Sequence, residues 1–133
     1  MHKLRMLIVE DDYLSQHLLL SFVAEYGSCD LADDGRKAVR AVEASYESDK
    51  PYDLIFMDIR LPELDGLDAI GEIRALEASH GDPACASLKI LMTTAMNDPH
   101  FVIEAFKKQC DGYITKPFSK PMLEKEIKKL GLA

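Results

Sequence analysis

Residues 54–66 read LIFMDIRLPELDG. The first four residues are apolar, which is typical of a strand buried in a parallel sheet. The apolar run ends at the acidic residue Asp58, and Pro62 and Gly66 then predict a loop before the next helix. A buried strand therefore carries a carboxylate at its carboxyl end, next to a loop.

Four other short apolar segments have the same character. The segments between them have apolar residues at the three- or four-residue spacing of one face of a helix, which we call a stripe. The five predicted strands are residues 4–9, 29–32, 52–57, 88–93 and 112–115. The stripes predict five helices, whose apolar positions are Leu14, Leu18, Phe22 and Tyr26, then Ala38, Val39, Val42 and Tyr46, then Leu67, Ile70 and Ile73, then Val102, Ala105 and Phe106, and finally Leu123, Ile127 and Leu130. Gly27 is expected to end the first helix, Asp33 or Asp34 to cap the second, and Ser119 to cap the last.

Alternating strands and helices predict an α/β fold with a doubly wound, five-stranded parallel sheet. For a chain of this size the expected strand order is 2-1-3-4-5, and all of residues 1–133 form one domain. In this order, ligands bind outside the carboxyl ends of the first and third strands.

Composition excludes several classes of protein. The chain has 47% hydrophobic and 29% charged residues, as expected for a folded globular domain, and its net charge of -7 argues against nucleic acid as a direct partner. Its three cysteines form no CxxC pair, which favours a reducing, cytoplasmic location. No segment is long and apolar enough to predict a signal peptide or a membrane span.

Three acidic residues, Glu10, Asp11 and Asp58, follow the two strands that flank the predicted binding edge. Carboxylates this close together repel each other unless a cation shares the site. Because the ligands would all be oxygen atoms, Mg²⁺ is the expected metal and Mn²⁺ is also compatible, whereas zinc is not. The alternative is that the three acids are separate, solvated loop residues.

The last two strands bring a hydroxyl and an ammonium group to the same edge. The fourth strand ends in Thr93-Thr94-Ala95 and the fifth in Thr115-Lys116-Pro117. A lysine neutralises phosphoryl oxygens and a threonine hydroxyl donates a hydrogen bond to them. Either residue alone is unremarkable, but beside three acids they indicate a phosphoryl site.

Four motifs occur in order: IVEDD at the first strand, FMDIRLPELDG at the third, MTTA at the fourth and GYITKPF at the fifth. With these motifs, the chain resembles the response-regulator receiver domains of two-component signalling over nearly its whole length. The resemblance implies a flavodoxin-like fold and makes Asp58 the phosphoacceptor. It also implies that Glu10 and Asp11 are the acidic pair and that the backbone carbonyl of Arg60 is a further metal ligand.

The resemblance assigns roles to the later motifs as well. Lys116 would bind the phosphoryl group, and its bond to Pro117 would be cis. Thr94 would move toward the phosphoryl group, and Tyr113 would occupy the aromatic switch position. The phosphoryl donor would be a phosphohistidine on a histidine kinase or a histidine phosphotransfer protein.

The same resemblance implies a phosphorylated signalling switch that assists its own chemistry, and not an enzyme with a separate substrate. The fourth helix, fifth strand and fifth helix would present the surface read by a downstream target, which the sequence does not identify. A stand-alone regulator is favoured, and the alternative is a receiver from a longer response regulator or hybrid kinase. Arg60 is expected to extend its side chain over the phosphoryl site and slow hydrolysis, and the alternative is a solvated side chain that contacts nothing there.

Other functions fit the residues less well. A flavin-binding module of this topology needs a phosphate cradle after the first strand, where this chain has the acids Glu10, Asp11 and Asp12. A phosphatase with an aspartyl nucleophile would resemble its family in carrying a second acid two residues later, where this chain has Arg60. A receiver fold kept only for protein interaction is disfavoured because the acceptor, the acids and the lysine are all present.

Overall fold

A computed structural model describes residues 3–80, 88–95, 103 and 109–132. Its centre is a five-stranded sheet in the order β2-β1-β3-β4-β5, in which every neighbouring pair is parallel. The strands are β1 (Leu4–Val9), β2 (Gly27–Ala32), β3 (Leu54–Asp58), β4 (Lys89–Thr94) and β5 (Gly112–Thr115). The predicted fold class and strand order are confirmed.

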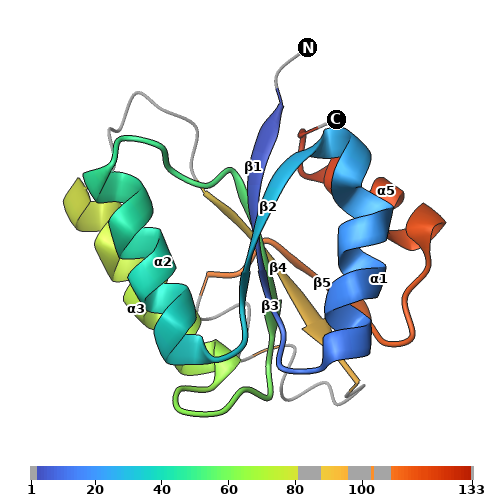
Figure 1. Ribbon diagram of the computed structural model, residues 1–133, viewed down its shortest axis with the longest axis horizontal. Helices are drawn as coiled ribbons and strands as arrows, with labels where there is room; N and C mark the ends of the chain where they lie inside the picture. The colour runs from blue at the N-terminus through green and yellow to red at the C-terminus, as the bar shows by residue number, and fades with distance from the viewer. Residues whose placement is uncertain (1–2, 81–87, 96–102, 104–108, 133) are drawn as a thin grey trace.

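Helices cover both faces of the sheet, as Figure 1 shows. One face carries α1 (Tyr13–Val23) and α5 (Lys120–Lys129), and the other carries α2 (Gly35–Glu47) and α3 (Gly66–His80). The helix expected around Val102 and Phe106 lies outside the described residues. In the part of the chain that the structure describes, no helix combines the length and apolar character needed to span a membrane.

Side chains of each strand alternate between two separate hydrophobic clusters. In β3, Leu54 and Phe56 join the cluster under α1 and α5, whereas Ile55 and Met57 join the cluster under α2 and α3. All five residues of β3 are buried. The continuous apolar run of the sequence therefore reflects a strand that is covered on both faces.

Polar caps set the starts of the helices. The Asp34 side chain accepts a hydrogen bond from the Lys37 backbone at the start of α2, and the Ser119 hydroxyl accepts one from Met122 at the start of α5. Asp12 caps α1 in the same way through the Ser15 backbone. The contacts at Asp34 and Ser119 confirm two expected caps, and the cap at Asp12, which was not predicted, begins α1 directly after the acidic motif.

The predicted apolar face of α1 is only partly correct: Phe22 and Tyr26 pack against the core, but Leu14 and Leu18 do not. Its buried residues are Leu19 and Val23, whereas Leu14 is 67% exposed and Leu18 is 40% exposed. The helix contains the run Leu18-Leu19-Leu20. More than one set of its apolar residues therefore has the four-residue spacing of a helix face, and spacing alone does not show which set is buried. The outcome is a helix with apolar side chains on its solvent side.

Several boundaries also differ from the expectation. Helix α1 ends at Val23, one 3₁₀ turn (Ala24–Tyr26) follows, and Gly27 begins β2 instead of ending the helix. Helix α3 continues to His80, well beyond Ile73, the last apolar position predicted for it. Strand ends are set by the hydrogen bonds of neighbouring strands, which a single sequence does not reveal.

The loop between β3 and α3 depends on Gly66. A Cβ atom at this position would lie 2.1 Å from the backbone oxygen of Asp58, far inside contact distance. The Gly66 amide also donates a hydrogen bond of 2.8 Å to the Ile59 carbonyl. Only glycine permits this approach, so the start of α3 is held directly against the end of β3.

We expect Gly66→Ala to lower the free energy of unfolding by about 2–4 kcal/mol, because the new methyl group must displace the backbone that carries Asp58. Gly71 in the same helix is the matched control, since a Cβ there would meet nothing within 4 Å. Gly71→Ala should raise stability by about 0.5–1 kcal/mol. Urea denaturation of the two variants measures both changes, and equal effects would contradict the close approach at Gly66.

Candidate functional site: an acidic cluster with a lysine at the carboxyl edge of the sheet

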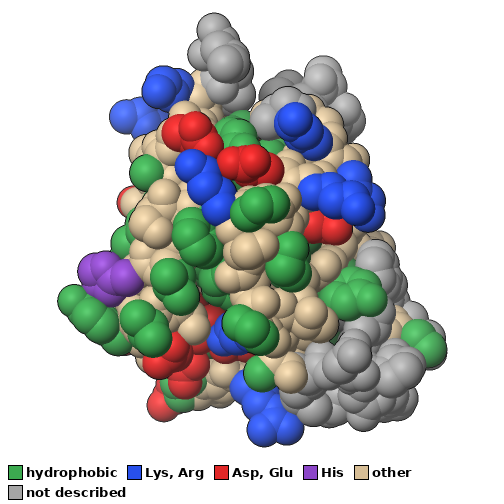
Figure 2. Space-filling view, turned by 90° about the vertical axis from the view of Figure 1, so that its right-hand side faces the viewer, with side chains coloured by type: hydrophobic (Ala, Val, Ile, Leu, Met, Phe, Trp, Pro, Cys, Tyr) green, Lys and Arg blue, Asp and Glu red, His purple; other side chains and the backbone are tan. Residues whose placement is uncertain are grey.

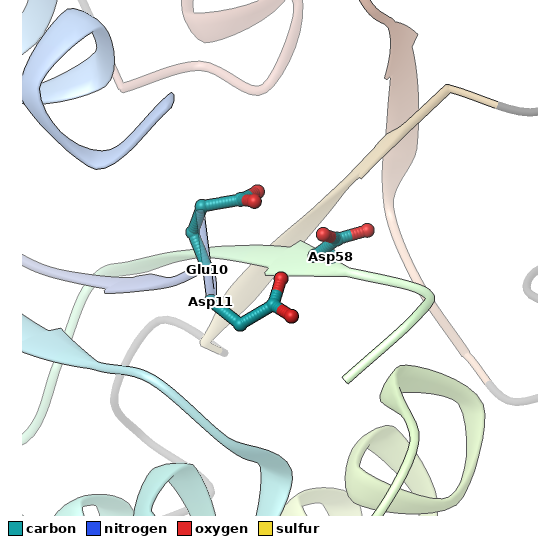
Figure 3. Close-up of side chains that lie close together, drawn as sticks. All are labelled: Glu10, Asp11 and Asp58. Carbon is teal, nitrogen blue, oxygen red and sulfur yellow. The ribbon is translucent and has the colours of Figure 1, made fainter. Parts of the chain in front are cut away.

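The three predicted acids meet at the carboxyl ends of β1 and β3. Each of Glu10, Asp11 and Asp58 offers a carboxylate oxygen, and these oxygens all lie within 4.8 Å of one another. Figure 3 shows the three side chains facing a common space. Glu10 and Asp58 are buried, whereas Asp11 is exposed. The sequence prediction that these acids converge is confirmed, and the alternative of separate loop acids is wrong.

Glu10 is fixed by contacts from three other segments. Its amide donates to the Ala32 carbonyl of β2 at 3.0 Å, and its own carbonyl accepts a hydrogen bond from Gln16 Nε2 of α1 at 2.6 Å. Its Oε1 accepts a bond of 3.2 Å from the Asp12 amide. Sequence analysis did not identify Gln16, because a glutamine inside a helix gives no signal of a contact with the preceding strand.

Lys116 bridges two of the acids from the end of β5. Its Nζ lies 2.8 Å from Glu10 Oε2 and 3.3 Å from Asp58 Oδ2. The Lys116 amide donates to the Thr94 carbonyl, and the Lys116–Pro117 bond is cis as expected. The lysine is thus the cation that the acid cluster requires in the absence of a metal.

The other oxygen of Asp58, Oδ1, accepts a hydrogen bond of 3.2 Å from the Arg60 amide. This contact folds the first residues after β3 back over the carboxylate. The Arg60 side chain is exposed. Its role over the phosphoryl site stays a prediction, as does the role of its carbonyl as a metal ligand.

Burial and neighbouring charges shift the pKa values of Glu10 and Lys116. Burial raises the pKa of Glu10 to about 7, with a further rise from the charge of Asp58, against the hydrogen bond from Lys116 that lowers it. Burial opposes the charge of Lys116, but the hydrogen bond to Glu10 and the charge of Asp58 outweigh it and raise the lysine pKa. The lysine therefore stays charged, while Glu10 exchanges a proton near neutral pH.

Thr94 and Tyr113 are the two predicted switch residues. Thr94 is the last residue of β4 and is 2% exposed, and Tyr113 on neighbouring β5 is 38% exposed. Met92 stands beside Tyr113 in the register of the two strands, and Thr94 beside Thr115. The two predicted switch residues therefore lie on adjacent strands, but Tyr113 is two positions before Thr115, the partner of Thr94.

A hollow of about 460 Å³ opens beside the acids. It is lined by Asp11, by five residues of the loop after β3 and by one residue of α3, namely Ile59, Arg60, Leu61, Pro62, Asp65 and Leu67. The exposed carboxylate of Asp11 is therefore reachable from solvent through this hollow.

Residues 6–128 match the sequence profile described as the response regulator receiver domain. The chain belongs to this family. The matched range includes the three acids and the lysine, together with Thr94 and Tyr113, the predicted switch residues.

Known proteins place similar receivers in two settings. The chemotaxis protein CheY of Halobacterium salinarum is 35% identical over 117 residues, which are 88% of this chain and 88% of that protein. Probable histidine kinase 3 of Oryza sativa is 29% identical over 96% of this chain, but the chain spans only 13% of the kinase. Similar receivers therefore form nearly a whole protein in one case and a small part of a long one in the other.

Solved receiver structures have the same fold. The receiver domain of Saccharomyces cerevisiae Ssk1, solved with the histidine phosphotransfer signalling protein Ypd1, is 34% identical with a TM-score of 0.83, covering 97% of this chain and 89% of that one. The receiver domain of sensor histidine kinase PA1611 from Pseudomonas aeruginosa has a magnesium ion in its active site cleft. It is 29% identical with a TM-score of 0.79, covering 96% and 97% of the two chains.

The raised pKa of Glu10 predicts a stability that depends on pH. Between its ordinary value of 4.5 and about 7, the folded chain keeps a proton on Glu10 that the unfolded chain releases. Stability is therefore greatest below this range and falls as the pH rises through it, by up to ~1.4 kcal/mol per pH unit. Urea denaturation at several pH values in the presence of a chelator measures the slope. Glu10→Gln should remove it, and an unchanged slope in this variant would contradict the assignment to Glu10.

Proposed function

We propose that Asp58 receives a phosphoryl group from a phosphohistidine on a histidine kinase or a histidine phosphotransfer protein, in a reaction that requires Mg²⁺. The observation that supports this most is the position of the Asp58 carboxylate, which contacts Lys116 and lies beside two further acids. An Asp58 oxygen attacks phosphorus, the bond from phosphorus to the histidine nitrogen breaks, and an acyl phosphate forms.

The acids fit the proposed metal. Their oxygens are close enough together for one small cation, and Mg²⁺ prefers carboxylate oxygens. Glu10, Asp11 and Asp58 would hold it together with the Arg60 carbonyl, and it would neutralise charge on the phosphoryl oxygens. Mn²⁺, which also accepts oxygen ligands, is expected to substitute.

Lys116 has a separate task in this proposal. In the described structure its ammonium group neutralises Glu10 and Asp58. When the phosphoryl group adds about one to two negative charges, the same ammonium group contacts its oxygens. Thr94 then moves toward the phosphoryl group, and Tyr113 responds on the adjacent strand.

The response is proposed to be read on the surface of β5 and α5. Tyr113 and Met122 there are 38% and 37% exposed, as is usual for a surface that can bind a partner. The downstream target is therefore expected to be a protein, and the whole chain a cytoplasmic signalling switch without a separate substrate. Whether it acts alone, as favoured, or within a longer regulator or hybrid kinase stays a prediction.

Incubation with acetyl phosphate and Mg²⁺ should add one phosphoryl group to the chain, because a small donor needs only the acceptor, the metal and the lysine. Intact-mass measurement detects the adduct. Asp58→Asn should abolish it, since an amide is a poor nucleophile, and so should a chelator. An adduct of equal yield on Asp58→Asn would overturn the proposal.

Replacing Lys116 by Met should leave Mg²⁺ binding intact or tighten it, because the acids remain and a competing cation is removed. The same variant should form the acyl phosphate at least about 100-fold more slowly, since it no longer neutralises the phosphoryl oxygens. Asp11→Asn is the comparison, and its Mg²⁺ affinity should fall instead. Metal titration by calorimetry distinguishes the two variants, and equal losses of affinity would show that Lys116 only supports the structure.

The start of α1 offers a surface for the phosphoryl donor. Tyr13 and Leu14 are 74% and 67% exposed, and Leu18 follows one turn later at 40%. Figure 2 shows hydrophobic side chains gathered on the face that α1 and α5 cover. Since α1 begins two residues after Asp11, a donor bound here lies beside the acids. The similarity to Ssk1, which was solved with a histidine phosphotransfer protein, favours such a donor as the occupant.

We therefore expect Leu14→Ala to slow transfer from a phosphorylated histidine phosphotransfer protein by about tenfold, as truncating a central apolar contact does. Phosphorylation by acetyl phosphate should not change, because that donor makes no contact with α1. Glu43→Ala, on the exposed side of α2 across the sheet, is the control and should change neither rate. Radiolabelled transfer assays measure both rates, and an equal loss with both donors would exclude a docking role.

A further inference from the structure

The hydroxyl of Thr93 is the one buried side-chain polar atom without a hydrogen-bond partner in the part of the chain that the structure describes. Thr93 lies in β4 and is 0% exposed. A hydroxyl buried in this way loses its hydrogen bonds to water and gains none in return, which costs free energy in the resting chain. The position of this hydroxyl is explained if a hydrogen-bond partner becomes available to it in another state of the site.

The register of the sheet places Thr93 next to the acceptor. Asp58 of β3 is paired with Thr93 of β4. Val9 of β1 is paired with Met57 of β3, so the next residue, Glu10, lies beside Asp58 on the side opposite Thr93. Neighbouring strands are about 4.8 Å apart, so the side chains of adjacent residues in a row are within reach of each other.

The alternation of side chains puts Thr93 on the same face as the acid and the lysine. Side chains two residues apart in a strand share a face. Four strands contribute buried residues to the cluster under α1 and α5. In each of them a polar residue stands two positions after the last such residue: Ile8 before Glu10, Phe56 before Asp58, Leu91 before Thr93, and Ile114 before Lys116. Thr93 is therefore part of one polar layer at the top of this core.

Thr94 differs from its neighbour in this respect. Met92, two residues earlier, belongs to the cluster under α2 and α3, so the Thr94 side chain starts on the opposite face of the sheet. Reaching a phosphoryl group on Asp58 therefore requires Thr94 to move, whereas Thr93 already faces the Asp58 side. The two adjacent hydroxyls are suited to different tasks.

We propose that Thr93 is a positioning residue for the acceptor: its hydroxyl donates a hydrogen bond to the side-chain carboxyl of Asp58 once the phosphoryl group and the cation occupy the site. This inference rests on the proposed function of Asp58. In the resting chain the Asp58 oxygens already accept bonds from the Arg60 amide and from Lys116. When Lys116 turns to the phosphoryl oxygens, the Asp58 side chain loses a donor and Thr93 replaces it. The added bond holds the loaded carboxyl group in one orientation.

The test uses beryllofluoride with Mg²⁺ as a non-hydrolysable phosphoryl mimic, on the full chain and two variants. Thr93→Val keeps the shape of the side chain and removes the hydroxyl, and Thr93→Ser keeps the hydroxyl. Calorimetry measures the affinity for the mimic, and thermal unfolding without metal measures the stability of the resting chain. Binding by the unaltered chain tests the function of Asp58 itself, so failure of that function is seen separately.

We expect Thr93→Val to bind the mimic at least about tenfold more weakly, and Thr93→Ser to bind it like the unaltered chain. We also expect Thr93→Val to melt about 3 °C higher without metal, because the unpaired hydroxyl is gone. These two effects have opposite signs, which a purely structural role of Thr93 would not produce. Unchanged affinity in Thr93→Val, an equal loss in Thr93→Ser, or a lower melting temperature in Thr93→Val would each overturn the inference.

Discussion

The ion bridge from Lys116 to Glu10 and Asp58 is the interaction on which the site depends. Parallel strands bring their carboxyl ends to one edge of a sheet, and here that edge collects three carboxylates within 4.8 Å. Without a cation this arrangement is unfavourable, and Lys116 supplies one at 2.8 Å and 3.3 Å from two of the acids. A phosphoryl group and a metal ion can then replace the contacts between Lys116 and these acids.

Rigid backbone contacts hold the acceptor at this edge. Gly66 packs its Cα against the Asp58 backbone, and Gln16 binds the carbonyl of Glu10, so the ends of β3 and β1 are fixed by the helices that follow them. Group transfer requires the reacting atoms to be aligned to within a fraction of an ångström. Among the described residues, the buried hydroxyl of Thr93 is the exception, because it has no hydrogen-bond partner. A locally unfavourable arrangement of this kind is expected at a functional position.

Much of this arrangement could be predicted from the sequence, and the failures have physical reasons. The alternation of strands and helices and the size of the chain predicted the sheet order, and in that order the strands that end near Glu10, Asp58 and Lys116 bring these residues together. The expectation for α1 failed at Leu14 and Leu18 because Leu18, Leu19 and Leu20 fit more than one helical face, and only packing selects Leu19. Thr93 was named at the end of the fourth strand, but only Thr94 was given a role. Its position two residues after Leu91 predicts which face of the sheet its side chain is on. Its place beside Asp58 follows only from the register of β3 and β4.

The most direct test of the account is to locate the phosphoryl group chemically. Borohydride reduces an aspartyl phosphate to homoserine, which marks the modified residue permanently. Tandem mass spectrometry of the chain, phosphorylated with acetyl phosphate and Mg²⁺ and then reduced, should find homoserine at position 58. Homoserine at Asp11, Asp12 or another aspartate, or the longer alcohol 5-hydroxynorvaline at Glu10 or another glutamate, with Asp58 unmodified, would contradict the account.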